Sequence, residues 1–194
     1  LSSRERINLN IVLEEMRANF AYVVIAIYST YEDQRIFIFT EIIDNFSTLN
    51  PLKSKSRNYR ADCGISVQLI SFLIVSLIQC HNEYGKDFDY SRYEFLELNH
   101  STKAKKLELK EIVDNYWRSV SYQLESMEKA VNGFTISFLK KIIASYTPTL
   151  RKIVENILSD FILMVEMSEF PACSIILNSL LKHLLNICHT MDNT

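Results

Sequence analysis

The chain has 194 residues, with 21 basic and 23 acidic side chains and a formal net charge of −2. This length can bury roughly two-thirds of the surface of the unfolded chain, so a self-sufficient core is possible. Glycine and proline occur three times each, which leaves few positions for tight turns or β-hairpins. The composition therefore predicts an all-α protein, and with so few glycines a nucleotide-binding loop is nearly excluded.

Apolar residues recur at helical spacing in six blocks, which predict six helices. They are expected near residues 4–30, 33–49, 62–84, 105–145, 149–168 and 171–190. The helices fall into three antiparallel pairs, and pairs of about 40 to 50 residues fit the period of HEAT and armadillo repeats. We therefore expect an α-solenoid of HEAT-type helix pairs, in which residues 1–194 form a fragment of a longer array.

Prolines and glycines mark the helix boundaries. Pro148 and Pro171 each stand where a first helical turn would begin, and Thr147 can cap the helix that starts at Pro148. Gly133, which follows Asn132, lies in the middle of the fourth block, so that helix is either kinked or split there, or continuous. Residues 85–105 mix charged and aromatic residues without a helical period, and we interpret them as an insertion in the second pair.

The two ends of a repeat array differ from its middle because each repeat buries its apolar face only against its neighbours. The candidates for such uncovered side chains are Leu9, Val12, Phe20, Leu180, Leu184 and Ile187. The chain opens at Leu1 without an initiator methionine or a signal-peptide pattern, so we expect an excised segment. The apolar runs 20–28 and 65–77 are too short to cross a membrane and are expected to be buried solenoid helices.

The cysteines and histidines do not form a recognisable metal site. The four cysteines, which lack C-x-x-C spacing, are Cys63, Cys80, Cys173 and Cys188. We expect small buried thiols in a reducing compartment, the nucleus or the cytoplasm. His183, Cys188 and His189 are not spaced to place three ligands on one helical face, so no metal or other cofactor is expected.

Catalytic motifs are absent from the sequence. It contains no G-x-S-x-G and no H-E-x-x-H, and acidic pairs such as Glu14-Glu15 are explained by solvation of helix faces. Tyr116, Trp117 and Tyr122 are expected to pack in the core rather than to stack on exposed bases, because their spacing does not make one exposed face. We therefore expect a protein that is not an enzyme.

A loop between the second and third expected helices reverses the charge of this slightly acidic chain. Residues 52–60 carry four cations and no acid, namely Lys53, Lys55, Arg57 and Arg60. Held between two helices, they can neutralise several adjacent phosphates of DNA. Such contacts read no bases, so the expected binding is independent of sequence. The alternative interpretation is a solvated linker.

Two further groups of cations are candidates for the same role. The first, at the start of the fourth helix, contains Lys103, Lys105 and Lys106, and its alternative is an ordinary solvated helix entry. The second, on both sides of the turn before the fifth helix, contains Lys140, Lys141, Arg151 and Lys152. These residues would lengthen the basic track if the repeats bring their turns to one edge.

Several short segments, taken in order, resemble the central HEAT-repeat region of the Nipped-B-like (adherin) family of cohesin loading subunits. They are Asp33-Gln34-Arg35, Phe37, Glu41-Ile42-Ile43, Arg57-Asn58-Tyr59-Arg60, Leu77-Ile78-Gln79-Cys80, Ser121-Tyr122, Phe134–Lys141, Ile157-Leu158-Ser159-Asp160, Glu169-Phe170-Pro171-Ala172, Leu177, Leu180-Leu181 and Leu184-Leu185. No segment is a specific motif by itself. Their ordered agreement over residues 20–190 carries the resemblance.

The resemblance implies a nuclear, chromatin-associated scaffold that helps to load cohesin. Such a segment would touch duplex DNA together with the ATPase heads and kleisin of the cohesin ring, and would stimulate an ATP hydrolysis whose catalytic residues belong to cohesin. It also implies a small TPR-like loader subunit, bound through a region outside this segment, and no membrane. The alternative is a HEAT-type interaction adaptor whose basic loop meets an acidic protein partner and which has no role on DNA.

Overall fold

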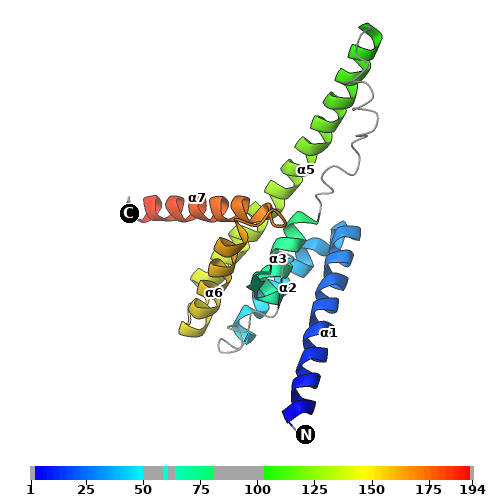
Figure 1. Cartoon of the computed structure of the whole chain (residues 1–194). Helices are drawn as coiled ribbons and strands as arrows, with labels where there is room; N and C mark the ends of the chain where they lie inside the picture. The colour runs from blue at the N-terminus through cyan, green and yellow to red at the C-terminus, as the bar shows by residue number, and fades with distance from the viewer. Residues whose placement is uncertain (1–2, 50–58, 61–63, 81–102, 193–194) are drawn as a thin grey trace. The chain divides into compact units, whose positions relative to one another are not determined.

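The computed structural model describes residues 3–49, 59–60, 64–80 and 103–192, and its fold is all-α, as predicted (Figure 1). The α-helices are α1 (Ser3–Thr30), α2 (Arg35–Asp44), α3 (Leu69–Gln79), α5 (Lys103–Ala144), α6 (Pro148–Met164) and α7 (Ala172–Asp192). Two short 3₁₀ turns, η1 (Glu32–Gln34) and η2 (Asn45–Thr48), flank α2. One short antiparallel pairing joins β1 (Tyr59–Arg60) to β2 (Ser66–Val67).

The chain forms two compact units. Residues 1–80 and 130–194 make the larger unit, and residues 81–129 make the smaller one. α5 contributes its residues 103–129 to the smaller unit and its residues 130–144 to the larger. Within the described residues, no helix is both long and apolar enough to cross a membrane.

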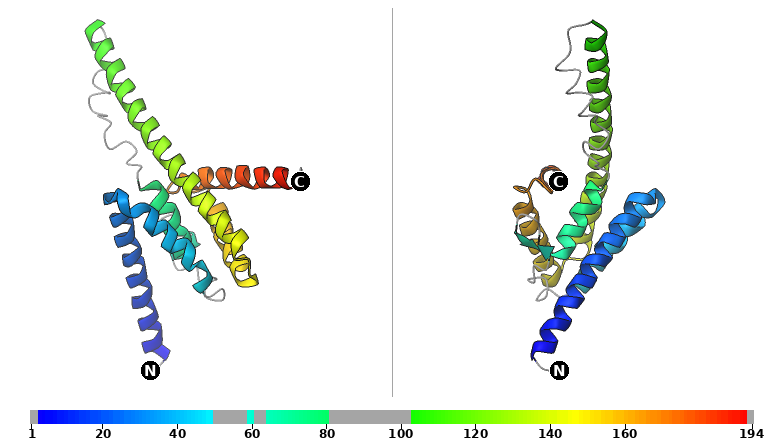
Figure 2. Two further views of the ribbon diagram at one scale, coloured as in Figure 1. Left: turned by 180° about the vertical axis from the view of Figure 1, so that it is seen from behind. Right: turned by 45° about the vertical axis from the view of Figure 1, so that its right-hand side comes forward.

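α3 is the central helix of the larger unit. Helices α1, α6 and α7 all pack against it, and Figure 2 shows it between α1 and α6. Its buried side chains are Ser71, Phe72, Ile74, Val75, Leu77 and Ile78. Burying each large apolar side chain contributes about 1.5–3 kcal/mol, so this helix anchors the elements around it.

The start of α3 differs from the predicted helix at 62–84. Gly64 has a φ of 88°, a conformation that glycine adopts without strain, and Ser66–Val67 form a strand opposite Tyr59–Arg60. The helix then begins at Leu69, and of its predicted end, residues 81–84 lie outside the described residues. The scarcity of glycine therefore did not exclude a β-hairpin-like pairing, because one glycine at the turn suffices.

A distant carboxylate caps the start of α3. Asp160 of α6, which is fully buried, accepts hydrogen bonds at Oδ2 from the backbone N–H of Gln68 at 3.0 Å and from Ser71 Oγ at 2.8 Å. A negative charge is favourable at a helix N-terminus, where backbone N–H groups lack partners within the helix. This contact fixes α6 against α3.

Arg35 closes the end of α1. Its Nε donates to the main-chain oxygen of Tyr28 at 3.0 Å, and its Nη2 donates to that of Ser29 at 3.3 Å. Its Nη1 forms an ion pair with Glu32 at 3.1 Å. The last carbonyls of a helix have no partner within it, so the guanidinium satisfies them and holds α2 against α1.

Aromatic rings join α1 and α2 to the part of α5 that belongs to the larger unit. Phe39 lies 5.2 Å from Tyr28 and 5.8 Å from Phe134, measured between ring centroids. Phe46 packs edge-on against Phe138 at 5.9 Å. Pairs in this range prefer tilted or edge-on arrangements, and each adds about 0.5–1.5 kcal/mol beyond its buried area.

The last two helices start close to where the prolines predict. Pro148 is the first residue of α6, and Thr147 Oγ1 accepts a hydrogen bond from the backbone N–H of Leu150 at 3.1 Å, which confirms the predicted cap. α7 begins at Ala172, so Pro171 precedes its first residue rather than lying in its first turn. Phe170, just before Pro171, is buried.

The sequence left open whether the fourth helix is interrupted at Gly133, and α5 runs through that residue without a split. Two other expectations need correction. The run 20–28 is not a buried helix, because Ala21 and Tyr28 are its only buried residues and Phe20 is 64% exposed. The expectation of core packing was also wrong for Trp117 and Tyr122, whose side chains are exposed, and Tyr116 is half-buried.

The predicted uncovered apolar residues are exposed in part. Leu9, Val12, Phe20 and Leu184 are exposed as expected, whereas Leu180 is buried and Ile187 is half-buried. Of the predicted insertion, residues 85–102 lie outside the described residues, and Lys103–Lys105 already belong to α5. The division into three helix pairs stays a prediction.

Candidate functional site

The predicted basic loop falls mostly outside the described residues. Lys53, Lys55 and Arg57 lie there, and Arg60 is the described member of the group. Its side chain is exposed, and its backbone pairs with Ser66 across the short β1–β2 ladder. The structure therefore fixes one end of the loop beside α3, and the role of its cations stays a prediction.

The cations at the start of α5 are described only by their backbone. Lys103, Lys105 and Lys106 form the first turn of this helix in the smaller unit, as the sequence predicts. The last turn of a helix attracts cations, whereas its first turn favours acidic residues. These lysines therefore do not stabilise the helix through its dipole. Their contact with DNA stays a prediction.

The turn between α5 and α6 presents two cations to solvent and uses two in ion pairs. Lys140 and Lys152 are exposed. Lys141 Nζ lies 3.1 Å from Asp44 Oδ1, which joins α5 to the end of α2, and Arg151 Nε donates to Glu155 at 2.8 Å. The hydrogen bond to Glu155 raises the pKa of Arg151. Exposed pairs of this kind contribute about 0–1 kcal/mol, so a stronger anion can displace them.

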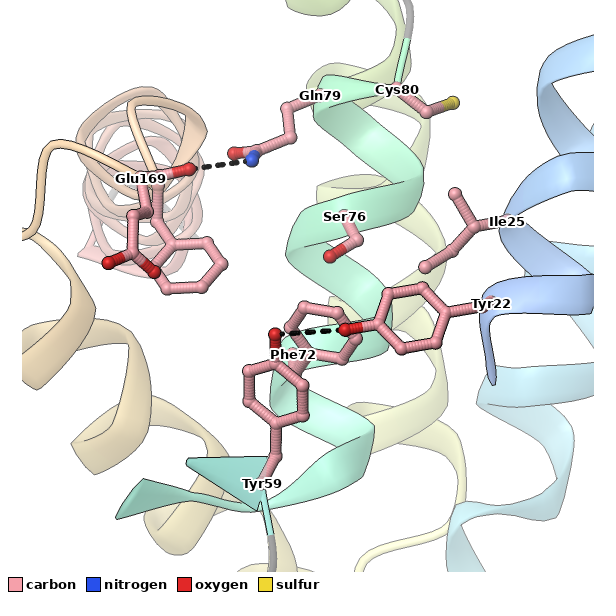
Figure 3. Close-up of a pocket in the computed structure, with 9 residues that line it drawn as sticks. Tyr22, Ile25, Tyr59, Phe72, Ser76, Gln79, Cys80 and Glu169 are labelled. Atoms are coloured by element: carbon pink, nitrogen blue, oxygen red, sulfur yellow. Dashed lines mark hydrogen bonds between the residues drawn. The ribbon is translucent and has the colours of Figure 1, made fainter. Parts of the chain in front are cut away.

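A pocket with a volume of about 380 Å³, which the sequence does not predict, lies on the larger unit (Figure 3). It is bounded by α1, by β1, by α3 and by the segment that enters α7. The nine residues that line it are Tyr22, Ile25, Tyr59, Phe72, Ser76, Gln79, Cys80, Glu169 and Phe170. These residues come from four places in the chain, so no local sequence pattern predicts the pocket.

Aromatic rings form the wall of the pocket. Tyr59 stacks on Phe72 with centroids 3.6 Å apart and an interplanar angle of 13°. Tyr22 and Phe170 each meet Phe72 edge-on, at 5.7 Å and 6.2 Å. Figure 3 shows the Tyr22 and Tyr59 side chains pointing toward one another, and their hydroxyl oxygens are hydrogen-bonded at 3.2 Å. These contacts tie α1 and β1 to α3.

The amide of Gln79 closes the other side of the pocket. Its Nε2 donates to the main-chain oxygen of Glu169 at 2.8 Å, and a carbonyl can only accept, so the bond fixes which amide atom faces Glu169. Gln79 Oε1 is buried and has no hydrogen-bond partner within the described part of the chain. Within that part of the chain, a residue that lines the pocket thus carries a buried acceptor without a donor.

The thiol in the pocket is not activated. Cys80 Sγ donates to the main-chain oxygen of Leu77 at 3.1 Å, and burial raises the pKa of the thiol to about 11, although Arg35 acts in the opposite direction. A thiol with this pKa is protonated at neutral pH and is a weak nucleophile. The arrangement is suited to binding rather than to nucleophilic catalysis.

The burial of the other cysteines agrees with the expectation only in part. Cys173 is fully buried, and burial raises its pKa to about 12. Cys188 is exposed, which corrects the expectation of a buried thiol, and Cys63 lies outside the described residues. The described cysteines are free thiols.

His183 has a structural contact. Its Nε2 donates to Asn132 Oδ1 at 2.8 Å, which links α7 to α5 within the larger unit. Across the described ranges, no group of three or more histidine, cysteine, aspartate or glutamate residues could hold a metal ion.

Comparison with known proteins supports the resemblance read from the sequence. No family model matches the chain, and no solved structure matches it. The chain is 29% identical over 170 residues to Nipped-B-like protein A of Danio rerio, 27% identical to Nipped-B-like protein B of Danio rerio and 28% identical to the Nipped-B-like protein of Homo sapiens. Each match covers 84% of this chain and 5% to 6% of the relative.

The chain thus spans about one-twentieth of the length of these relatives, 6% of Nipped-B-like protein A and 5% of Nipped-B-like protein B. The matched length is close to the expected range of residues 20–190. The all-α fold and the three matches together identify the chain as similar to a segment of the Nipped-B-like proteins.

Proposed function

We propose that the chain is a non-enzymatic scaffold segment of a nuclear cohesin loader, and that it helps to load cohesin onto chromatin by contacting the DNA backbone. The observation that carries the proposal is the similarity to Nipped-B-like proteins over 84% of the chain. In this role the segment contacts duplex DNA without sequence preference, together with the ATPase heads and kleisin of cohesin. The hydrolysis that it stimulates is performed by cohesin. A small TPR-like loader subunit binds elsewhere on the loader.

The exposed cations support the DNA contact. Arg60, Lys140 and Lys152 are exposed, and phosphate contacts gain affinity by releasing counterions from DNA. Lys141 and Arg151 contribute less, because each must leave or share a carboxylate to reach a phosphate. Lys53, Lys55 and Arg57 belong to the same run of cations as Arg60 in the sequence, and Lys103, Lys105 and Lys106 provide a separate DNA contact in the smaller unit.

Two observations support a scaffold without catalytic chemistry. In the described pocket burial raises the pKa of the Cys80 thiol, and its hydrogen bond goes to the main-chain oxygen of Leu77 rather than to a general base. The core is built from helix packing around α3, which is how repeat proteins hold extended surfaces in place. Both observations favour a role in binding.

The alternative function is a protein-interaction adaptor whose cations meet an acidic partner. The pairs of Lys141 with Asp44 and of Arg151 with Glu155 favour it to some extent, because they show that carboxylates suit these cations. Binding to an acidic protein surface and binding to a phosphate backbone differ in their dependence on salt. Each can be measured with its own partner. Direct assays therefore separate the two functions.

The experiment uses the full-length protein, purified cohesin and duplex DNA. Lys53, Lys55, Arg57 and Arg60 are changed together to glutamate, and the DNA-stimulated ATP hydrolysis by cohesin is measured. We expect the variant to lose most of its stimulation, whereas Lys182→Glu, an exposed control on α7, keeps it. Equal stimulation by the variant and the wild-type protein would contradict the proposal.

A further inference from the structure

The aromatic pocket on the larger unit has an electrostatic character of its own. Four of its nine described lining residues are aromatic, Glu169 is the one charged residue among them, and none is lysine or arginine. The faces of aromatic rings carry negative potential and attract cations, most strongly where water is excluded. A pocket that is lined by aromatic rings and one glutamate therefore favours a cationic group over an anionic one.

The orphan oxygen of Gln79 adds a requirement for a hydrogen-bond donor. The bond from Gln79 Nε2 to Glu169 holds the amide in place, so Oε1 cannot turn away to find another partner. Within the described residues no donor reaches this buried atom. Because a buried acceptor without a donor is unfavourable, a ligand that brings an N–H group to Oε1 supplies the missing bond.

We propose that the pocket binds an arginine side chain presented by a partner protein. A guanidinium is planar, stacks on aromatic faces and carries five N–H donors, so it can meet the rings and Gln79 Oε1 at once. Its apolar stem suits the wall at Ile25. A quaternary ammonium would satisfy the rings but has no N–H for Gln79, and a phosphate or carboxylate would be repelled by Glu169.

The size of the pocket fits a single side chain. Its volume of about 380 Å³ lies near the lower end of the roughly 300–1,000 Å³ range of ligand pockets. A pocket of this size is too small for a helix but large enough for one extended side chain. Tyr22 of α1 supplies one wall and Gln79 of α3 supplies the acceptor, so the site depends on the packing of these two helices. This function is independent of the proposed contact with DNA.

The chain carries its own reporter for the test. Cys80 lies on the pocket wall, and Cys188 is exposed on α7 outside it. In the full-length protein, the modification of both thiols by methyl methanethiosulfonate is followed by mass spectrometry while a model peptide, acetyl-Gly-Arg-Gly-amide, is added. The matched peptides replace the arginine with citrulline, which is neutral but keeps N–H donors, or with norleucine, which is apolar.

We expect the arginine peptide to slow the modification of Cys80 and to leave that of Cys188 unchanged, with clearly weaker protection by the two matched peptides. Tyr22→Leu should raise the concentration for half-protection about threefold or more, since it removes a ring and keeps an apolar side chain. Tyr31→Leu, which changes an exposed tyrosine outside the pocket, should have no effect.

Three results would overturn the proposal. Equal protection by the norleucine or citrulline peptide would show a pocket that does not select a cation. Absence of protection by the arginine peptide would show that arginine does not bind. Unchanged protection in the Tyr22→Leu protein, with its fold verified by circular dichroism, would place the binding outside the pocket.

Discussion

Gln79 and Glu169, which are 90 residues apart in sequence, are joined by a hydrogen bond of 2.8 Å from the side-chain amide of Gln79 to the main-chain oxygen of Glu169. Gln79 is the last residue of α3, and Glu169 lies in the segment that enters α7. Both belong to segments that carry the resemblance to the Nipped-B-like family. At this place, the resemblance therefore reflects a junction between helices.

Replacing Gln79 with methionine should destabilise this junction. The substitution keeps the length of the side chain and leaves the main-chain oxygen of Glu169 without its donor, which costs about 1–3 kcal/mol. Urea unfolding of the chain measures the difference. Gln34→Met, at an exposed position in η1, is the control and should change the free energy of unfolding by less than about 0.5 kcal/mol. Equal stability of the two variants would contradict the structural role of Gln79.

Asp160→Ala should be among the more damaging substitutions in α6. It removes the acceptor of two hydrogen bonds at the start of α3, and bonds to charged groups contribute about 1.5–3 kcal/mol each. Asp160→Asn should cost less, because its oxygen can still accept from Gln68 or Ser71. The order of the two unfolding free energies tests the cap, and an alanine variant as stable as the asparagine variant would exclude it.

The structure shows which parts of the fold a sequence can predict. The ends of α1 and α5 and the start of α6 follow from periodicity, and Thr147 and Pro148 are local signals. The start of α3 was placed too early because its cap, Asp160, comes from another helix, and no local pattern carries that information. A helical period also does not tell which apolar side chains meet a neighbour.

Of the candidate sites, too, only some features can be predicted from the sequence. A run of cations is visible in the sequence, whereas their pairing is not: Lys141 meets Asp44 from a helix almost a hundred residues away. The pocket was missed because Tyr22, Phe72 and Glu169 converge only after folding. Tyr59, Gln79 and Phe170 all belong to segments that carry the resemblance, but nothing in those segments indicates that the side chains line one cavity.

Phe170→Ala should cost roughly 3 kcal/mol or more, because the ring is buried beside Phe72 and its loss leaves a cavity. Phe37→Ala is the matched control, since that ring is 60% exposed on α2. Thermal or urea denaturation of both variants gives the comparison. A loss below about 0.5 kcal/mol for Phe170→Ala would mean that the ring is not part of the core.

The thiol of Cys80 should react slowly near neutral pH and faster in alkali. Burial raises its pKa to about 11, so the thiolate is scarce below that pH, and the rate should rise by about tenfold per pH unit until the pKa is approached. Cys173, whose pKa is raised to about 12 and whose side chain is fully buried, should react more slowly still. Rates of modification by iodoacetamide, resolved by mass spectrometry, check this order. A fast reaction of Cys80 at pH 7 would contradict the burial.

The most direct test of the account is the salt dependence of DNA binding by the full-length protein. Lys53, Lys55, Arg57 and Arg60 are replaced with glutamine, with Lys182→Gln as the exposed control, and the affinity for duplexes of several sequences is titrated at increasing salt. We predict weaker binding to every sequence alike and a salt slope reduced by about 0.9 for each lost phosphate contact. Affinity and slope equal to those of the wild-type protein, with the fold verified, would contradict the DNA contact and favour an acidic protein partner.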